Sequence, residues 1–283
     1  MFSSRVLISS VAALCTLALG ACGAPAAEED SQGSGGLPGE VSAAGKIVVA
    51  LNPTLKPISW VESNNELQGL VPDLANALGA QLGVDVELVP MSLDAMVPGL
   101  QSRKVDLALL TDSEERQKSL DFIDFLAFNQ TFVSRADGDL RPESYDDLCG
   151  LSVGASRGSS TIAELDALSG SCAAKGGAGV KVDVYDSQAA AAIAVRSGRT
   201  DVYLTTSTNA DQLIKEGDLA ASGEINPSFA GFVSAKNRTD LRDAVFEAMQ
   251  ALAADGRLKE PFATYELDST YMEPDINTAT DAS

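Results

Sequence analysis

The sequence predicts an α/β protein made of two similar halves, each a mostly parallel sheet flanked by helices. Short apolar runs of strand length alternate along the chain with segments that have the 3.6-residue apolar period of a helix. Strands that alternate with helices in this way form parallel sheets. The alternation restarts at Leu151, and 283 residues suffice for two compact lobes.

The first half begins with a near-continuous apolar strand at residues 46–51. A helix follows at 69–83, with leucines four residues apart on one face and a glycine at its end. Alternating apolar residues predict a strand at 84–88. A short helix is expected at 92–100, and the next strand begins at Val105.

The second half repeats this order, with a Gly- and Ser-rich turn after its first strand. Strands are expected at 151–155, 180–184 and 202–204, the turn at 156–160, and helices from Ile162 to Leu168 and at 189–195. Residues 102–106 (SRKVD) and 197–201 (SGRTD) share one layout, although a similarity this short also arises by chance. In that register Thr111 and Thr206 are equivalent.

The two halves are expected to meet at two extended stretches, residues 126–135 and 229–235. A last amphipathic helix is predicted at 240–254, and Gly256 ends it. From Glu273 the chain is polar, so a disordered tail is expected.

The composition excludes several classes of function. A formal net charge of −20 argues against nucleic-acid binding, because phosphate recognition requires a basic surface. The chain has no histidine, which removes Ser-His-Asp and Cys-His catalysis and histidine zinc sites. After the N-terminus no segment is apolar over the length of a membrane span. We therefore expect no enzyme activity, no cofactor and no metal.

The N-terminus has the features of an export signal. Arg5 precedes an apolar segment at 6–19, and residues 19–22 (LGAC) close it. This ending resembles a bacterial lipobox, in which Cys22 would carry a diacylglycerol whose two chains suffice for stable membrane anchoring. The alternative is ordinary secretory cleavage before that cysteine. Residues 23–45, rich in Ala, Gly, Ser and acidic residues, are expected to form a flexible tether.

The remaining cysteines predict one disulfide. Cys15 leaves with the signal and Cys22 takes the lipid, so Cys149 and Cys172 remain in an exported, oxidising setting. A bond between them would stabilise the fold by about 3 kcal/mol through the entropy of the unfolded chain. Two free thiols are the alternative.

The stretch from Val105 to Phe122 is the predicted ligand-contact segment. Its strand ends near Asp112, and Ser113 is a predicted helix N-cap. Arg116 then falls in the first turn, where the helix dipole disfavours a cation. Either a glutamate of the same turn neutralises this arginine at a solvated surface, or its guanidinium is placed to bind a carboxylate in a cleft.

These elements, in this order, resemble the bacterial extracellular solute-binding proteins of family 3, the receptors of ABC transporters for polar amino acids. The similarity covers about residues 46–271. It rests on collinear motifs: GLVPDL at 69–74, VPGLQSRKVD at 97–106, SEER at 113–116, DF at 121–122 and AADG at 253–256. Residues 147–150 (DLCG), together with Cys172, are similar to a branch common in high-GC Gram-positive bacteria.

The resemblance implies a two-lobed periplasmic-binding-protein-like fold of type II, in which two hinge strands join the lobes and the cleft closes on its ligand. The implied organisation is a lipoprotein signal peptide at 1–22, a tether at 23–45, lobe 1 at 46–134, lobe 2 at 135–230, a return to lobe 1 at 231–272, and a tail at 273–283.

The resemblance also implies the ligand contacts. Arg116 is expected to grip the ligand's carboxylate, with Thr111 and Ser113 holding the same ligand. From the other lobe, the turn Gly158-Ser159-Ser160 offers backbone N–H groups at a helix start, unless it is a plain connection. Arg157, beside that turn, is either a second basic contact or solvated.

An aromatic contact and one departure complete the expected site. Trp60 lies close to where the family places an aromatic residue against the ligand, with core packing or surface exposure as the alternative. The family usually has an aspartate at the position of Thr206 to pair the ligand's ammonium, and a buried ammonium without a partner is costly. Either Asp112 or Glu62 substitutes, or the ligand is not a standard α-amino acid. It would then be a carboxylate without the amine, or a solute held by neutral hydroxyls.

The function implied by the resemblance is that of a monomeric substrate-binding lipoprotein of an ABC importer. It would capture an amino-acid-like or other small carboxylate-bearing solute on the extracytoplasmic face of the cell membrane and deliver it to a permease. The alternatives are a lipoprotein that presents its ligand to a separate membrane sensor, and an enzyme similar to cyclohexadienyl dehydratases on the same fold.

Overall fold

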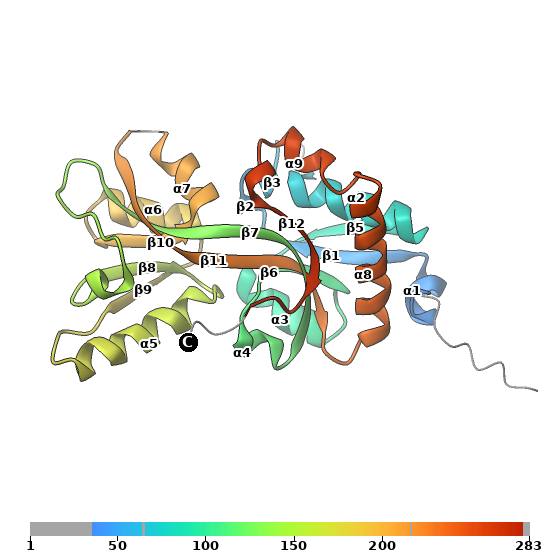
Figure 1. Cartoon of the computed structure of the whole chain (residues 1–283), viewed down its shortest axis with the longest axis horizontal. Helices are drawn as coiled ribbons and strands as arrows, with labels where there is room; N and C mark the ends of the chain where they lie inside the picture. Colours follow the sequence, from blue (N-terminus) through green and yellow to red (C-terminus); the bar gives the residue numbers. More distant parts are fainter. Residues whose placement is uncertain (1–35, 64–65, 216, 280–283) are drawn as a thin grey trace, which may run out of the picture. The chain divides into compact units, whose positions relative to one another are not determined.

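Two groups of helices and strands share one long β-sheet (Figure 1). The structure is a computed structural model that describes residues 36–63, 66–215 and 217–279, all within one continuous unit, Gly35–Ser283. The export signal, with Cys22, and most of the expected tether lie outside the described residues.

The described elements follow the alternation expected from the sequence. The helices are α1 Gly39–Ala44, α2 Leu70–Leu82, α3 Leu93–Gln101, α4 Glu114–Gln117, η1 Tyr145–Leu148, α5 Thr161–Ala174, α6 Gln188–Arg196, α7 Ser207–Ile214, α8 Thr239–Ala254, α9 Glu260–Thr264 and η2 Asp268–Thr270. The strands are β1 Lys46–Leu51, β2 Thr54–Leu55, β3 Ser59–Val61, β4 Leu67–Gln68, β5 Asp85–Pro90, β6 Leu107–Thr111, β7 Leu120–Arg135, β8 Ser152–Ser156, β9 Lys181–Tyr185, β10 Val202–Thr206, β11 Leu219–Ala235 and β12 Tyr271–Ile276. Of the described helices, none combines the length and the apolar character that crossing a membrane requires.

The order of strands divides the large sheet into two parallel parts. The order is β5-β1-β6-β11-β7-β10-β8-β9, with β12 paired to β7, and a small antiparallel sheet holds β2, β3 and β4. β1 is parallel to β5 and β6, and β8 is parallel to β9 and β10. Between these parts, β7 and β11 pair antiparallel to each other and run from one group of elements to the other (Figure 1). They are the two hinge strands, and the predicted lobe boundaries at 134 and 230 stay predictions because both groups share these strands.

The first half has a core on each face of β5-β1-β6. In β6, Leu107 and Leu109 belong to one buried cluster while Ala108 and Leu110 belong to the other, as expected for side chains that alternate across a strand. Helices α2 and α8 cover the first face and α3 covers the second. The buried side chains of α2 and α8 that share the first cluster include Leu70, Leu74, Leu78, Leu241, Val245, Met249 and Leu252. Each fully buried side chain of this size contributes about 1.5–3 kcal/mol. The late helix α8 therefore completes the first half.

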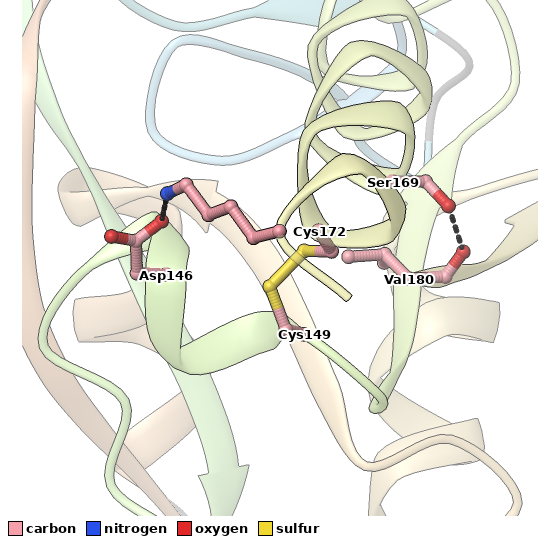
Figure 2. The surroundings of a disulfide bond; sticks show 6 residues. Asp146, Cys149, Ser169, Cys172 and Val180 are labelled. Atoms are coloured by element: carbon pink, nitrogen blue, oxygen red, sulfur yellow. Dashed lines mark hydrogen bonds and ion pairs between the residues drawn. A yellow bond between two sulfur atoms is a disulfide. The ribbon is translucent and has the colours of Figure 1, made fainter. Parts of the chain in front are cut away.

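The second half is held by a smaller core and by the predicted disulfide, which is confirmed. Cys149, just after η1, bonds to Cys172 of α5, with Cα atoms 5.7 Å apart (Figure 2). In the same region Lys175 forms an ion pair of 2.9 Å with Asp146. Since Cys172 is also buried among the apolar residues of α5, β8 and β10, the bond ties η1 to the core of this half.

The last part of the expected tether is folded, which corrects the prediction of a flexible segment through residue 45. Residues 39–44 form α1, and Gly45 ends it with a positive φ of 65°. Val41 is only 3 % exposed and joins the first core cluster. Glu40 pairs with Arg238 at 2.9 Å. The sequence shows no apolar period here because Val41 is the one buried residue of α1, and Leu37, before the helix, is only partly buried against the same cluster.

The expected disorder from Glu273 is also wrong for residues 273–279. β12 pairs with β7. Beyond the strand, the backbone N–H of Thr278 donates to Asp124 at 3.0 Å and that of Ala279 donates to Asp112 at 2.9 Å. The backbone of residues 278 and 279 is thus held by two buried carboxyl groups. Because these contacts use backbone N–H groups, they require no apolar pattern in the sequence of the segment.

Candidate functional site

A cavity lies where the two halves meet the hinge strands. It has a volume of about 110 Å³, roughly ten times what one water molecule requires. Both halves and both hinge strands line it: Asn52, Leu55, Ile58, Leu93, Leu109, Leu110, Thr111, Arg116, Leu126, Phe128, Gln130, Ser156, Ser159, Ser160, Thr161, Gln188, Tyr203, Leu204, Thr205, Thr206, Thr208, Ser228 and Ala230.

The cavity is located by the ends of two equivalent strands. β6 ends at Thr111 and β10 ends at Thr206, and both threonines line the cavity. Each strand is followed at once by a helix, α4 or α7. Because ligands of open α/β sheets bind at the carboxyl ends of the strands, this is the edge at which a site is expected. The correspondence drawn from SRKVD and SGRTD therefore matches the structure.

Arg116 reaches across the cavity from the first half to the second. Its backbone N–H donates to the Oγ of Ser113, at 3.4 Å, so Ser113 is the N-cap of α4 as predicted. Its guanidinium donates to the carbonyl of Thr111 at 2.6 Å and to that of Gly158, in the other half, at 2.7 Å. A guanidinium has five N–H donors, so three have no partner within the described part of the chain and are available to a ligand in the cavity.

The local electrostatics keep this guanidinium charged although it is partly buried. Burial lowers the pKa of Arg116, and the carboxylates of Glu164 and Asp112 act in the opposite direction. Because the ordinary pKa of an arginine lies far above neutral pH, such a change leaves the cation intact at neutral pH. The cavity therefore contains a fixed positive charge that water solvates only in part.

The turn after β8 closes against the first half through Gly158. This glycine has a φ of +79°, and a Cβ placed on it would lie 2.5 Å from the backbone nitrogen of Asp94 at the start of α3. A side chain at this position would therefore separate the two halves. With the carbonyl of Gly158 bonded to Arg116, the turn touches the first half at two points.

Apart from Leu204, the residues that the second half contributes to the lining are neutral and polar. Tyr203 and Ser156 form a buried hydrogen bond of 3.3 Å between their hydroxyls, and burial raises the pKa of Tyr203, so that hydroxyl stays protonated. Thr206 accepts from the N–H of Asn209 at 3.3 Å and so caps α7. The Oγ of Ser159 and the Oε1 of Gln188, both in the lining, are buried and have no partner within the described part of the chain.

Several residues expected at the site do not line the cavity. Ser113 acts as a helix cap, and Gly158 contributes its backbone carbonyl to Arg116. Asp112 is 5 % exposed, and its carboxylate accepts from the side chain of Gln117 and from the backbone of Ala279. It therefore supports α4 and the C-terminal segment from behind the site. By contrast, Thr111, Arg116, Ser159, Ser160 and Thr206 all line the cavity.

Trp60 and Arg157 also lie outside the cavity lining, so the aromatic ligand contact expected at Trp60 stays a prediction. The indole N–H of Trp60 donates to Glu62 at 2.7 Å, and its ring packs edge-on against Tyr265 with centroids 6.0 Å apart. Arg157 is exposed and pairs with Asp186 at 2.9 Å, which is the solvated alternative. The aromatic residues that do line the cavity are Phe128 and Tyr203.

Sequence reasoning missed several lining residues on the second half and the hinge strands. Gln188 begins α6 directly after β9, at the same edge as the ends of β8 and β10. The rule that parallel strands gather their carboxyl ends could therefore have identified it. Phe128 and Gln130 lie in the middle of β7, and no local pattern marks the part of a hinge strand that faces a cavity. Among the described residues, no cluster of His, Cys, Asp or Glu could hold a metal ion.

A cavity between two α/β lobes that share a pair of long strands, with a charged side chain bridging the lobes, defines a two-lobed solute receptor of the type II periplasmic-binding class. The comparisons with known proteins agree. The sequence profile of the bacterial extracellular solute-binding proteins, family 3, matches residues 47–267, and the chain belongs to this family.

Three similar proteins illustrate the relationship. The arginine-binding protein ArgT of Corynebacterium glutamicum is 24 % identical over 84 % of this chain and 79 % of its own length. The L-cystine-binding protein TcyJ of Escherichia coli is 29 % identical over 79 % of this chain and 84 % of its own. The solved structure of holo ArgBP from T. maritima superimposes with a TM-score of 0.69 at 28 % identity, covering 79 % of this chain and 98 % of that one.

Proposed function

We propose that this solute-binding protein captures a small carboxylate-bearing solute in its interlobe cavity and delivers it to the permease of an ABC importer. The supporting observation is Arg116, a partly buried cation that lines the cavity and, within the described residues, uses two of its five N–H donors to bond to both halves. A guanidinium with adjacent free donors suits the two oxygens of a carboxylate. Thr111, Ser159, Ser160 and Thr206 provide further hydrogen-bonding groups around it.

A thermal-shift screen followed by calorimetry tests this function. The probes are amino acids, their amides, amines and small carboxylates, since a ligand that binds only the folded state raises the melting temperature. We expect carboxylates to bind and the corresponding amides and amines to fail. Arg116→Ala should weaken binding by about 100-fold or more without unfolding the protein.

Arg157→Ala is the matched control, since it removes the same charge from an exposed residue beside the turn that contacts Arg116. It should bind like the wild type. An equal loss in both variants, or no loss in Arg116→Ala, would contradict the assignment of Arg116 to the site.

We further propose that the chain is a lipoprotein, anchored on the extracytoplasmic face of the cell membrane through Cys22. The sequence LGAC at 19–22 supports this proposal, and the family is described as extracellular. In cells, Cys22→Ser should move the protein from the membrane fraction to the soluble one. If the Cys22→Ser protein stays in the membrane fraction, it is held there by an uncleaved signal or by another anchor. That result would refute lipidation at Cys22.

The site supports binding rather than catalysis. Among the described residues of the lining, none is an acid, a lysine or a histidine, and the phenol of Tyr203 is held protonated by burial. General acid–base chemistry near neutral pH requires a group that titrates there. We therefore expect no turnover of arogenate or prephenate. Product formation above the level of Arg116→Ala would contradict this expectation.

A further inference from the structure

The charges that line the cavity indicate which charged groups its ligand has. Among the described residues that line it, Arg116 is the one charged side chain, and all others are apolar or neutral polar. The site therefore presents one positive charge and no negative one. An α-amino acid brings a carboxylate and an ammonium, and only the first of these finds a partner of opposite charge here.

The carboxylates that act electrostatically on Arg116, those of Asp112 and Glu164, do not supply the missing partner, and neither does Glu62. Both oxygens of Asp112 accept from the side chain of Gln117, at 3.0 and 2.9 Å, and one also accepts from a backbone N–H, all away from the lining. Glu164 accepts the hydroxyl of Tyr145 at 2.8 Å and does not line the cavity. Glu62, exposed, accepts from Trp60.

The energetics disfavour an ammonium in this space. A charged group removed from water without an ionic partner costs several kcal/mol. Arg116 adds repulsion, because a second cation in the same cavity faces a positive charge that is only partly solvated. An anionic ligand has the opposite effect: it neutralises a guanidinium whose pKa burial already lowers.

Two unpartnered groups indicate what replaces the ammonium. The hydroxyl of Ser159 can donate to a carboxylate oxygen, and the Oε1 of Gln188 is a buried acceptor that requires a donor from the ligand. A buried acceptor left without a donor costs about 1–3 kcal/mol. A neutral hydroxyl or amide N–H on the ligand satisfies Gln188 without bringing charge.

We propose that the ligand is a small monocarboxylate without an ammonium group, with an apolar body and a neutral hydrogen-bond donor such as a hydroxyl. Its carboxylate binds Arg116, its body contacts the leucines and Phe128 of the lining, and its donor reaches the neutral wall of the second half. This inference rests on the proposed function and specifies the solute class of the same cavity.

Calorimetric titration with matched sets of compounds tests the inference on the wild-type protein. Each set has one carbon skeleton, that of alanine, leucine, phenylalanine or glutamine, presented as the L-amino acid, the 2-hydroxy acid, the deaminated acid and the decarboxylated amine. For a skeleton that binds, we expect the two amine-free acids to bind at least about tenfold more tightly than the amino acid. The amine should not bind.

The outcomes separate the two levels of the proposal. If an amino acid binds as tightly as its amine-free counterparts, or more tightly, and Arg116→Ala abolishes that binding, the inference is wrong while the proposed function stands. If no acid of any set binds, both fail.

The variant Thr206→Asp tests the same idea by adding the missing charge. Thr206 lines the cavity and caps α7, and aspartate is at least as good an N-cap, so the helix should be preserved. We expect this variant to gain affinity for amino acids by at least about tenfold and to bind amine-free acids more weakly. Ser207→Asp is the control, because it adds the same charge one residue further on, outside the lining. Equal behaviour of the two folded variants would overturn the inference.

Discussion

The two halves of the molecule present the same arrangement to the cavity with different chemistry. In each, a five-residue strand ends at a threonine of the lining, and a hydroxyl side chain caps the helix that follows, Ser113 for α4 and Thr206 for α7. The first turn of α4 then carries Arg116, whereas that of α7 carries Asn209, whose amide donates to Thr205 at 2.8 Å. One scaffold therefore supplies a charge from one side and neutral hydrogen bonds from the other.

The halves also differ in the long-range connection that stabilises each of them. In the first half, the C-terminal segment bonds to the buried carboxyl groups of Asp112 and Asp124, directly behind the segment that carries Arg116. In the second half, a disulfide between η1 and α5 has this role. The comparison suggests that each half needs one long-range connection in addition to its core. The stability of the first half should then respond to pH and that of the second to redox conditions.

Removing the disulfide should have the largest effect on stability. The double variant Cys149→Ser/Cys172→Ser releases a loop with a sequence separation of 23 residues, and the chain-entropy estimate gives a loss of about 3 kcal/mol in the free energy of unfolding. Urea denaturation measures it. Reduction of the wild type should reproduce the loss, and reduction of the variant should add nothing. A difference below about 1 kcal/mol would show that the core of the second half suffices.

The buried carboxyl pair predicts a pH dependence for the first half. Burial, and to a smaller degree the neighbouring Asp112, raise the pKa of Asp124 from 3.8 to about 7, against a hydrogen bond from Thr278 that lowers it. Between these two pH values the folded state holds one proton more than the unfolded state. The free energy of unfolding should therefore decrease as the pH rises toward 7, by at most about 1.4 kcal/mol per unit.

Asp124→Asn isolates this contribution, because the amide cannot ionise. Urea denaturation at pH 5 and pH 7 should show about 1–2 kcal/mol less loss in this variant than in the wild type. Asp275→Asn, which changes an exposed carboxylate on β12, should keep the wild-type dependence. Identical pH dependence in all three proteins would show that Asp124 does not cause the pH dependence of the free energy of unfolding.

Gly158→Ala should weaken ligand binding by interfering with the contact between the halves. The added Cβ meets the backbone of Asp94 at 2.5 Å and must also adopt a positive φ. Gly176→Ala is the control, since Gly176 has a similar φ of +83° but open space around it. Both variants should lose about 1 kcal/mol of stability. Only Gly158→Ala should lower the affinity for a carboxylate probe, by about tenfold. Equal affinities would show that the turn does not approach α3 in the bound state.

The sequence predicts those features that depend on local patterns. The apolar period of α2 and the glycine that ends it, the alternation in β9 and the capping serine of α4 all lie where the sequence places them. The sequence marks Arg116 as a candidate ligand contact because the helix dipole disfavours a cation in the first turn of a helix. That conflict between local preference and sequence is typical of functional positions.

The features that the sequence could not predict depend on distant partners. Val41 packs on a core assembled from both ends of the chain, and Thr278 is ordered by a carboxyl group more than 150 positions away. Asp112 is adjacent to the ligand segment but turns to the C-terminal segment, and no local signal indicates which side of the chain its carboxylate takes. Phe128 and Gln130 line the cavity because β7 passes it between β11 and β10, a position that depends on the strand order of the whole sheet.

The smallest predicted effect is on ligand affinity, and it distinguishes two roles of a helix cap: stabilising the fold and positioning Arg116. Ser113→Ala and Ser144→Ala each remove a hydroxyl that caps a helix, α4 and η1 respectively. Each should cost about 1 kcal/mol in urea denaturation. Only Ser113→Ala should also reduce the affinity for a carboxylate probe, by about threefold, because the turn that it loosens positions the guanidinium, whereas Ser144 and η1 lie outside the lining of the cavity. If Ser144→Ala lowers the affinity equally, the effect comes from general destabilisation, and α4 has no special role in placing Arg116.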